Sequence, residues 1–388
     1  MRAAPRKLLM AGSIAACLGA AAALPVLADG PDPSLVQVTA AEGTPIAGQY
    51  IVTLKDGAST SAAAAQVKAS AVQQFDGVLN GFAAKLTSDQ LSKLQRNKQV
   101  AAIEQDQIVK VAGTQIGPTW GLDRIDQRKL PLNKRYNYKA LGRGVNAYVI
   151  DTGLDTKHKD FGGRASIAWK APGYKDGNDC NGHGTHVAGI LGSKTYGVAK
   201  DVKLRALRVL GCDGTGPMSN VVAAVRWLHK NAAKPAVANI SVGGPKSQAL
   251  DIAVSNLSRS GVFVSVAAGN EGAPACNSSP AGANVVMTVG ATTKTDSRPT
   301  FSNYGKCVDI NAPGHAVVST WPGNRTARLD GTSMATPYVS GVAALYLAGH
   351  RKASFAQVEK WLKTNATKNR ITHLPKGTPN LLLYKGTL

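Results

Sequence analysis

The chain has 388 residues, of which 44% are hydrophobic and 41 are glycine, so it is long enough for two or three domains with many tight turns. Its formal net charge is +22, of which residues 1–111 supply 10 − 8 = +2 and the remainder 35 − 15 = +20. The basic residues are scattered and lack the aromatic-interleaved clusters of nucleic-acid-binding surfaces. We therefore expect a solvated basic surface without a specific nucleic-acid partner, and polyanion binding is the alternative.

The N-terminus has the pattern of a secretory signal. Three basic residues precede an apolar run over residues 8–27, which ends in small residues at Ala28. We expect residues 1–28 to be cleaved and the protein to be secreted. Two alternatives stay open: a membrane anchor, although Pro25 interrupts the run, and a bacterial lipoprotein cleavage box at residues 14–17. Elsewhere no run is long enough to span a membrane, so no membrane partner is expected.

Residues 29–48 are rich in Pro, Gly and Asp and are interpreted as a linker. Residues 49–111 then alternate between strand and helix patterns. Strands are expected at residues 50–54, 81–86, 100–104 and 107–111, with helices at residues 59–71 and from Ser88. This segment has no cysteine and few chemically reactive side chains, and its pattern predicts a small α+β domain.

From Gly144 onward, short apolar strands alternate with helical stretches. Strands are expected at residues 145–150, 204–209, 237–242, 262–266 and 285–289, with helices between them, for example at 220–232 and 248–259. Near-continuous apolar strands separated by helices predict an α/β domain, residues 112–388, whose parallel sheet is covered by helices on both faces. Ligands bind beyond the carboxyl ends of such strands, so residues that follow a strand are the candidates for chemistry.

Three segments supply the members of a nucleophilic relay. Asp151 closes a predicted strand, His183 opens a predicted helix, and Ser333 begins a long apolar helix. A serine hydroxyl is a poor nucleophile at neutral pH and needs a base, which a third group orients. The chain order Asp, His, Ser is one of those known for such triads. We therefore predict Ser333 as nucleophile, His183 as general base and Asp151 as orienting carboxylate.

Other interpretations of these residues are weaker. The Asp-Thr-Gly segment at residues 151–153 also suits an aspartic peptidase, but that chemistry needs two such carboxylates and the chain has one Asp-Thr-Gly. His183 and His186 lie three residues apart, yet they lack the glutamate of the HExxH zinc motif, so His186 is expected to be a packed structural histidine. Taken alone, Ser333 would be interpreted as a helix cap, and the other two members of the relay favour catalysis instead.

These segments resemble the subtilase family of serine peptidases, and their sequences are similar to those of its proteinase K and aqualysin group. The resemblance covers residues 120–388 and implies a subtilisin-like fold. It also implies that Asn270 donates to the oxyanion together with the backbone N–H of Ser333; a turn asparagine is the alternative. Residues 49–111 resemble the subtilase propeptide, a ferredoxin-like α+β domain that serves as intramolecular chaperone and inhibitor and is removed by autocatalysis. An independent small domain is the alternative for that segment.

The same resemblance assigns segments that pair with an extended peptide or form the walls of the main specificity pocket. These residues are Gly214, Gly216, Ser241, Val242, Gly243, Ala267, Ala268 and Gly269. Pairing through main-chain hydrogen bonds tolerates many peptide sequences. No charged residue stands in these segments, so we expect broad specificity with a preference for an apolar or aromatic residue before the cut.

Of the five cysteines, Cys17 leaves with the predicted signal. In a secreted protein the other four are expected to pair, which allows three connectivities. Close Cys-x-x-Cys pairs, which metal ligation by thiolates would prefer, are absent. The resemblance implies the pairs Cys180–Cys212 and Cys276–Cys307.

Calcium is expected as a structural ion, and no cofactor is expected for catalysis. By resemblance, Asp309 matches a calcium-ligating aspartate of proteinase K, where backbone oxygens corresponding to Asn284 and Val286 help. A second set places oxygens at positions i, i+3 and i+4 and resembles a calcium site of aqualysin-like relatives: Asp123, Asp126 and Gln127. Helix capping or surface charge is the alternative for either set.

The sequence thus predicts a secreted, monomeric subtilisin-like serine endopeptidase that acts on protein and peptide substrates and is inhibited by its own propeptide. The alternative is an inactive subtilase scaffold that binds peptides or polyanions.

Overall fold

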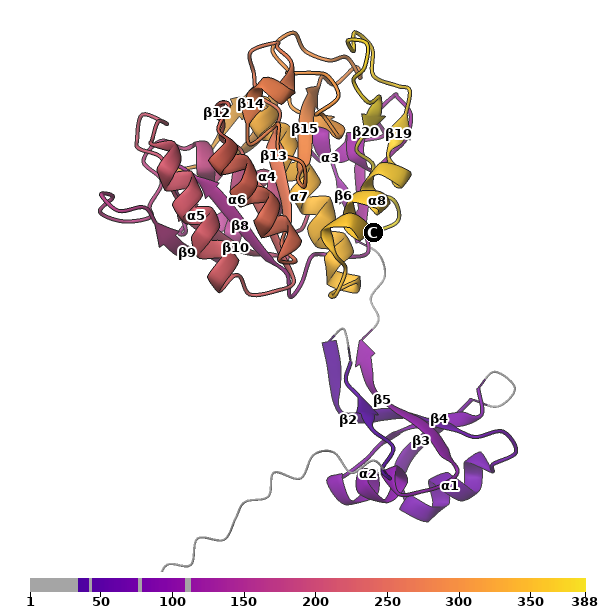
Figure 1. Cartoon of the computed structure of the whole chain (residues 1–388). Helices are drawn as coiled ribbons and strands as arrows, with labels where there is room; N and C mark the ends of the chain where they lie inside the picture. The colour runs from indigo at the N-terminus through magenta and orange to yellow at the C-terminus, as the bar shows by residue number, and fades with distance from the viewer. Residues whose placement is uncertain (1–33, 42–43, 76–78, 109–112) are drawn as a thin grey trace, which may run out of the picture. The chain divides into compact units, whose positions relative to one another are not determined.

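The structure, a computed structural model, describes residues 34–41, 44–75, 79–108 and 113–388 (Figure 1). The chain divides into two compact units, residues 1–109 and 110–388. The predicted signal, residues 1–28, lies outside the described residues. Within the described part of the chain, no helix is long and apolar enough to cross a membrane.

The N-terminal unit is a five-stranded sheet with two helices. Its strand order is β1-β5-β2-β4-β3. The strands are β1 (Val38–Thr39), β2 (Thr44–Leu54), β3 (Ser70–Gln74), β4 (Gly81–Lys85) and β5 (Val100–Ile108), and the helices are α1 (Thr60–Val67) and α2 (Ser88–Gln95). Val52, Phe82, Leu94 and Ile103 form its buried core. The prediction of a small α+β domain is confirmed, while β1 and the first residues of β2 lie within residues 29–48, which we had interpreted as linker.

The C-terminal unit contains a nine-stranded sheet with the order β19-β20-β16-β15-β13-β11-β8-β10-β9. The neighbouring strands run parallel, except that β19 and β20 are antiparallel. The strands are β8 (Asn146–Asp151), β9 (Ala165–Lys170), β10 (Lys203–Arg208), β11 (Ala236–Ile240), β13 (Phe263–Ala267), β15 (Met287–Thr292), β16 (Ile310–Pro313), β19 (Thr367–Lys368) and β20 (Leu381–Leu382). Every residue of β8, β11 and β13 is buried, as expected for strands covered on both faces.

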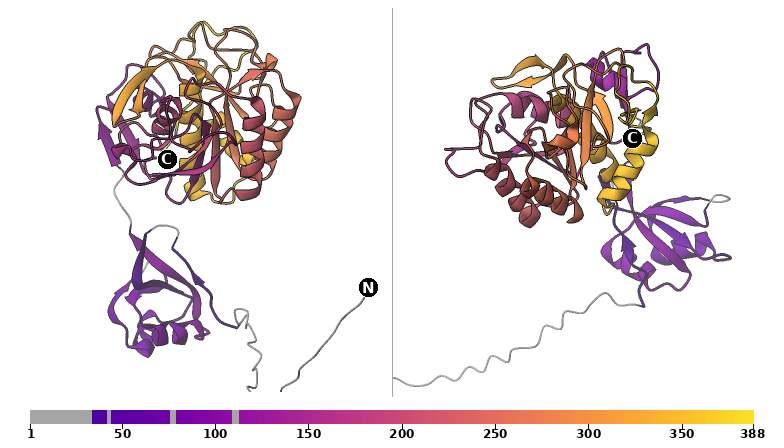
Figure 2. Two further views of the ribbon diagram at one scale, coloured as in Figure 1. Left: turned by 90° about the vertical axis from the view of Figure 1, so that its left-hand side faces the viewer. Right: turned by 45° about the horizontal axis from the view of Figure 1, so that its top comes forward.

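Helices cover both faces of this sheet (Figures 1 and 2). The helices are α3 (Trp120–Ile125), α4 (His183–Gly192), α5 (Met218–Asn231), α6 (Gln248–Arg259), α7 (Thr332–Gly349) and α8 (Phe355–Asn365). The side chains of β8 divide alternately between two cores. Ala147 and Val149 pack in the core that contains α4, α7 and α8, whereas Tyr148 and Ile150 pack with α5 and α6. The predicted sheet with helices on both faces is therefore confirmed.

Three short antiparallel pairs and two 3₁₀ turns complete this unit. They are β6 (Gly113–Ile116) with β7 (Arg135–Tyr138), β12 (Gly244–Pro245) with β14 (Ser278–Ser279), β17 (Val317–Trp321) with β18 (Arg325–Leu329), and the turns η1 (Lys159–Phe161) and η2 (Ala275–Asn277). Disulfides join Cys180 to Cys212 and Cys276 to Cys307, the pairing that the resemblance implied.

Candidate active site

The candidate residues gather at the carboxyl ends of three adjacent strands. Asp151 is the last residue of β8, Ser241 follows β11, and Asn270 lies three residues after β13. These strands are direct neighbours in the order β13-β11-β8 and run parallel. Their ends therefore meet at one edge of the sheet, where a doubly wound α/β fold binds its ligands.

Asp151 and His183 form a directly bonded pair. His183 Nδ1 lies 2.7 Å from Asp151 Oδ1, and the Thr152 backbone N–H donates to the same oxygen over 2.7 Å. Asp151 is fully buried, whereas the His183 side chain is 26% exposed. Burial alone would lower the pKa of His183, but the Asp151 charge and its hydrogen bond outweigh burial and raise that pKa. The carboxylate thus orients the ring and favours its protonated form.

Glycines make the close approach of α4 to this turn possible. Gly182, directly before the helix, has φ +114°, a backbone conformation that side-chain-bearing residues rarely adopt. At Gly184 a Cβ atom would lie 2.3 Å from the Gly153 carbonyl oxygen, so only glycine lets the helix start pack on the turn after Asp151. The glycines that flank His183 therefore set its distance from Asp151.

Asp179 is a buried carboxylate that the sequence interpretation missed. It accepts the Thr152 hydroxyl at 2.9 Å, the Gly182 backbone N–H at 2.8 Å and the Thr185 hydroxyl at 2.6 Å. It thereby ties the residue after Asp151 to the first turn of α4. The available signal was an aspartate four residues before His183, in a segment where short polar side chains commonly bond nearby backbone N–H groups.

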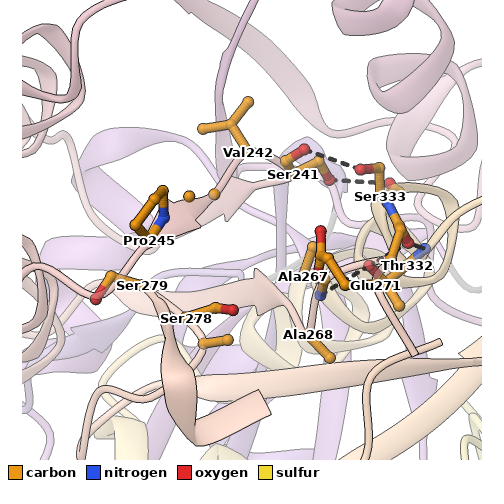
Figure 3. Close-up of a pocket in the computed structure, with 15 residues that line it drawn as sticks. Ser241, Val242, Pro245, Ala267, Ala268, Glu271, Ser278, Ser279, Thr332 and Ser333 are labelled. Atoms are coloured by element: carbon orange, nitrogen blue, oxygen red, sulfur yellow. Dashed lines mark hydrogen bonds between the residues drawn. The ribbon is translucent and has the colours of Figure 1, made fainter. Parts of the chain in front are cut away.

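Ser333 is the second residue of α7 and is 9% exposed. Its hydroxyl donates to the Ser241 carbonyl oxygen at 3.0 Å, and the Ser241 hydroxyl donates back to the Ser333 carbonyl oxygen at 2.9 Å (Figure 3). The described hydrogen bonds therefore place the Ser333 hydroxyl on Ser241 and not on His183. Ser333 and His183 line two adjoining cavities, and residues 241–243 line both of them.

The amide of Asn270 has a defined orientation. Its Oδ1 accepts the Thr332 backbone N–H at 2.8 Å and the Thr332 hydroxyl at 2.9 Å. Because a backbone N–H can only donate, this contact identifies the oxygen and leaves the amide nitrogen to donate elsewhere. Asn270 and Ser333 line the same cavity.

That cavity has a volume of about 340 Å³. The predicted residues that line it are Ser241, Val242, Gly243, Ala267, Ala268 and Gly269. Glu271 also lines it, close to Ala267 and Thr332 (Figure 3). Its carboxylate accepts the Asn303 side-chain amide at 2.7 Å, which holds it in place. We had expected no charge in these segments because the interpreted motif ended one residue earlier, at Asn270.

A second cavity of about 440 Å³ adjoins the first. Gly214 and Gly216 line it together with His183, Asn181 and the shared residues 241–243. The structure therefore brings all of the predicted substrate-binding residues to the two cavities that contain Ser333 and His183.

The acidic side chains predicted to bind calcium already have other partners. At Asp309, Lys363 Nζ lies 2.7 Å from Oδ1 and the Thr288 backbone N–H donates to Oδ2 at 2.8 Å. A calcium ion at the Asp309 carboxylate would meet an ammonium group that already neutralises it.

The second predicted set is occupied in the same way. Asp123 accepts the backbone N–H groups of Asn133 and Lys134, and the Gln127 side-chain oxygen accepts the Asn133 N–H. Asp126 Oδ1 lies 3.1 Å from Lys385 Nζ. Among the described residues, no three or more His, Cys, Asp or Glu side chains are grouped to hold a metal ion.

A buried carboxylate paired with an imidazole, beside a hydroxyl at a helix N-terminus, defines the class of serine hydrolases. The Subtilase family matches residues 142–380, and Peptidase inhibitor I9 matches residues 49–112. The chain belongs to the subtilase family and is a subtilisin-like serine protease preceded by an inhibitor-type propeptide domain.

Similar proteins support this assignment. The chain is 49% identical to the "Extracellular serine proteinase" of Thermus sp. (strain Rt41A), over 80% of this chain and 76% of that protein. It is 40% identical to "Proteinase R" of Parengyodontium album, over 89% of this chain and 90% of that protein. A crystal structure of a cold adapted subtilisin-like serine proteinase aligns with a TM-score of 0.68 and 49% identity, covering 69% of this chain and 98% of that one.

Proposed function

We propose that this subtilase is a secreted endopeptidase in which Ser333 attacks the peptide carbonyl, His183 moves the proton, Asp151 orients His183 and Asn270 binds the oxyanion. The observation that carries the proposal is the 2.7 Å contact between His183 and the buried Asp151, next to the cavity that holds Ser333 and Asn270. The relatives named extracellular and the N-terminal signal pattern support secretion.

The reaction follows from these positions. The Ser333 hydroxyl leaves the Ser241 carbonyl, gives its proton to His183 Nε2 and bonds to the substrate carbonyl carbon. The charge that develops on the carbonyl oxygen is stabilised by the Asn270 amide nitrogen and by the Ser333 backbone N–H, which lies in the first turn of α7 and so has no acceptor within the helix. His183 then protonates the leaving amine, which departs. Water, deprotonated by His183, releases the acyl group and restores the Ser333 hydroxyl.

The cavity predicts two kinds of preferred side chain before the cut. Its walls of alanine and glycine suit an apolar or aromatic group. The Glu271 carboxylate adds a partner for the charged end of a long basic side chain whose methylene groups pack on the same walls. Glu271 is exposed, so the expected gain is small, as for other solvated ion pairs.

Peptide substrates with lysine or phenylalanine before the cut test this preference. Glu271→Gln should lower kcat/KM for the lysine substrate several-fold and leave the phenylalanine substrate within a factor of two, because only the charge changes. Glu359→Gln, on helix α8 outside the pocket, controls for the loss of one negative charge, and its Tm is measured as well because Glu359 also pairs with Lys363. Equal effects on both substrates would show that Glu271 acts through the pocket walls and not through its charge.

The I9 match, the two compact units and the resemblance support autocatalytic maturation, with residues 49–111 as the inhibitor of the monomeric enzyme. The intact masses of the secreted protein and of Ser333→Ala test it. We expect the wild type to lose residues up to about position 111 and the variant to keep them. If both stay full length, the protein is an inactive scaffold that binds peptides; if both are trimmed alike, another peptidase matures it.

A further inference from the structure

A lysine side chain pairs with one aspartate in each of the two sets that the sequence predicted to bind calcium. Lys363 reaches from α8 to Asp309, with Nζ 2.7 Å from Asp309 Oδ1, and the same nitrogen lies 2.5 Å from Glu359 Oε1. One ammonium group therefore bridges two carboxylates. The Lys363 side chain is 34% exposed, so this bridge is partly solvated.

The second lysine is more deeply buried. Lys385 Nζ lies 3.1 Å from Asp126 Oδ1, and both side chains are 3% exposed. The other Asp126 oxygen accepts the backbone N–H and the side-chain amide of Asn137, at 3.0 and 2.8 Å. Lys385 also donates to the Leu388 carbonyl oxygen at 3.0 Å. Both partners of this ion pair therefore have additional hydrogen bonds.

These contacts leave little place for a divalent cation. Calcium needs six to eight oxygen ligands at 2.3–2.6 Å. Each carboxylate oxygen named here already accepts an N–H or ammonium donor at hydrogen-bond distance. A calcium ion on the same oxygen would lie close to a positive nitrogen, and the repulsion between the two cations would oppose its binding.

We propose that Lys363 and Lys385 take the place of structural calcium in this subtilase, so that its folded state requires no calcium ion. Each ammonium group supplies positive charge to a carboxylate that is partly buried at Asp309 and buried at Asp126. Each also fixes a C-terminal segment to that carboxylate: α8 to the strand edge at Asp309, and the residues after β20 to the segment after α3. The proposal is independent of the catalytic assignment, because it concerns stability alone.

The first test uses the secreted wild-type protein after treatment with a sulfonyl fluoride, which prevents autolysis during heating. Its calcium content is measured by atomic emission, and its Tm by calorimetry in excess EGTA and in excess CaCl₂. We expect calcium well below one ion per chain and the same Tm in both buffers. One or more bound calcium ions, with a Tm that falls in EGTA, would overturn the proposal.

The second test removes the ammonium groups. Lys363→Ala should lower the Tm by a few degrees and Lys385→Met by roughly 10 °C, because each leaves a carboxylate without its partner and the second pair is buried. Exposed Lys360 on the same helix provides the control Lys360→Ala, which should have no effect. CaCl₂ should restore part of the loss in Lys363→Ala and none in the control. If Lys363→Ala melts like the control in both buffers, Lys363 does not replace calcium at Asp309.

Discussion

At the scale of single residues, the Asp151–His183 contact makes a prediction about pH. His183 accepts a proton only when neutral, so kcat/KM falls as the pH falls through its pKa. Because the pKa is raised, this fall should be centred above pH 6.5 in the wild type. Asp151→Asn should lower kcat about 10⁴-fold and move the midpoint to lower pH. A pH–rate profile checks both; an unchanged midpoint would mean that Asp151 does not set the pKa of His183.

Asn270 predicts a loss confined to the chemical step. Asn270→Ala removes the proposed oxyanion donor and should lower kcat about 10²–10³-fold with little change in KM, because the contact forms mainly in the transition state. The second consequence is structural: Thr332 loses the acceptor of its N–H. Asn270→Asp keeps an acceptor and should match the loss in kcat without a loss in Tm. A kcat that stays near the wild-type value would remove Asn270 from the oxyanion site.

Burial of His186 should make the folding stability depend on pH. It is fully buried, and burial lowers its pKa to about 4, although its ring contacts the Ala327 carbonyl oxygen. The unfolded chain, with a histidine pKa near 6.5, therefore binds more protons between pH 4 and 6.5. Stability should fall by about 3 kcal/mol as the pH falls through this window.

Urea unfolding of the inhibited enzyme at pH 6.5 and at pH 4 measures this loss. His186→Gln should reduce it, and exposed His229→Gln should not. The same acid-induced loss in both variants would place its origin in the carboxylates.

At the scale of elements, the close packing at the start of α4 means that adding one methyl group at Gly184 should reduce both stability and activity. Gly184→Ala would push α4 away from the Gly153 carbonyl, lengthen the His183–Asp151 contact and destabilise the fold by about 1–3 kcal/mol. Gly349→Ala, at the end of α7 in open space, is the matched control. Calorimetry and kcat check the pair; a Gly184→Ala enzyme with wild-type kcat would show that the helix start adjusts.

The elements also show how far sequence patterns reach. The five predicted strands of the large domain correspond to β8, β10, β11, β13 and β15, because strands buried on both faces leave continuous apolar runs. The patterns gave no comparable signal for β9, none of whose six residues is fully buried, or for the two-residue strand β20. Motif spacing located Asp151, His183 and Ser333. Asp179, Glu271 and Lys363 were missed because their roles come from partners distant in sequence or from the shape of the pocket.

At the scale of the whole molecule, the two disulfides provide a comparison. They span 32 and 31 residues, so each should stabilise the fold by a similar amount, about 3 kcal/mol. Only Cys180–Cys212 adjoins His183, the proposed base: Asn181 accepts the His183 backbone N–H and donates to the Cys212 carbonyl oxygen. Replacing this pair by serine should lower both stability and kcat/KM, whereas replacing Cys276 and Cys307 should mainly lower stability. Equal losses of kcat/KM would contradict a link through Asn181.

The strand order of the large sheet also bears on how the enzyme acquires and keeps its structure. Parallel neighbours such as β8 and β11 are far apart in sequence, so long crossovers must close before the catalytic groups meet. Such topologies fold slowly, because long loops must close before the native contacts form. In the proposed mature enzyme, which lacks the N-terminal unit, the lifetime should depend on how rarely the chain crosses the unfolding barrier. In a solution of active peptidase, a molecule that unfolds would be cleaved by other molecules of the enzyme before it could refold.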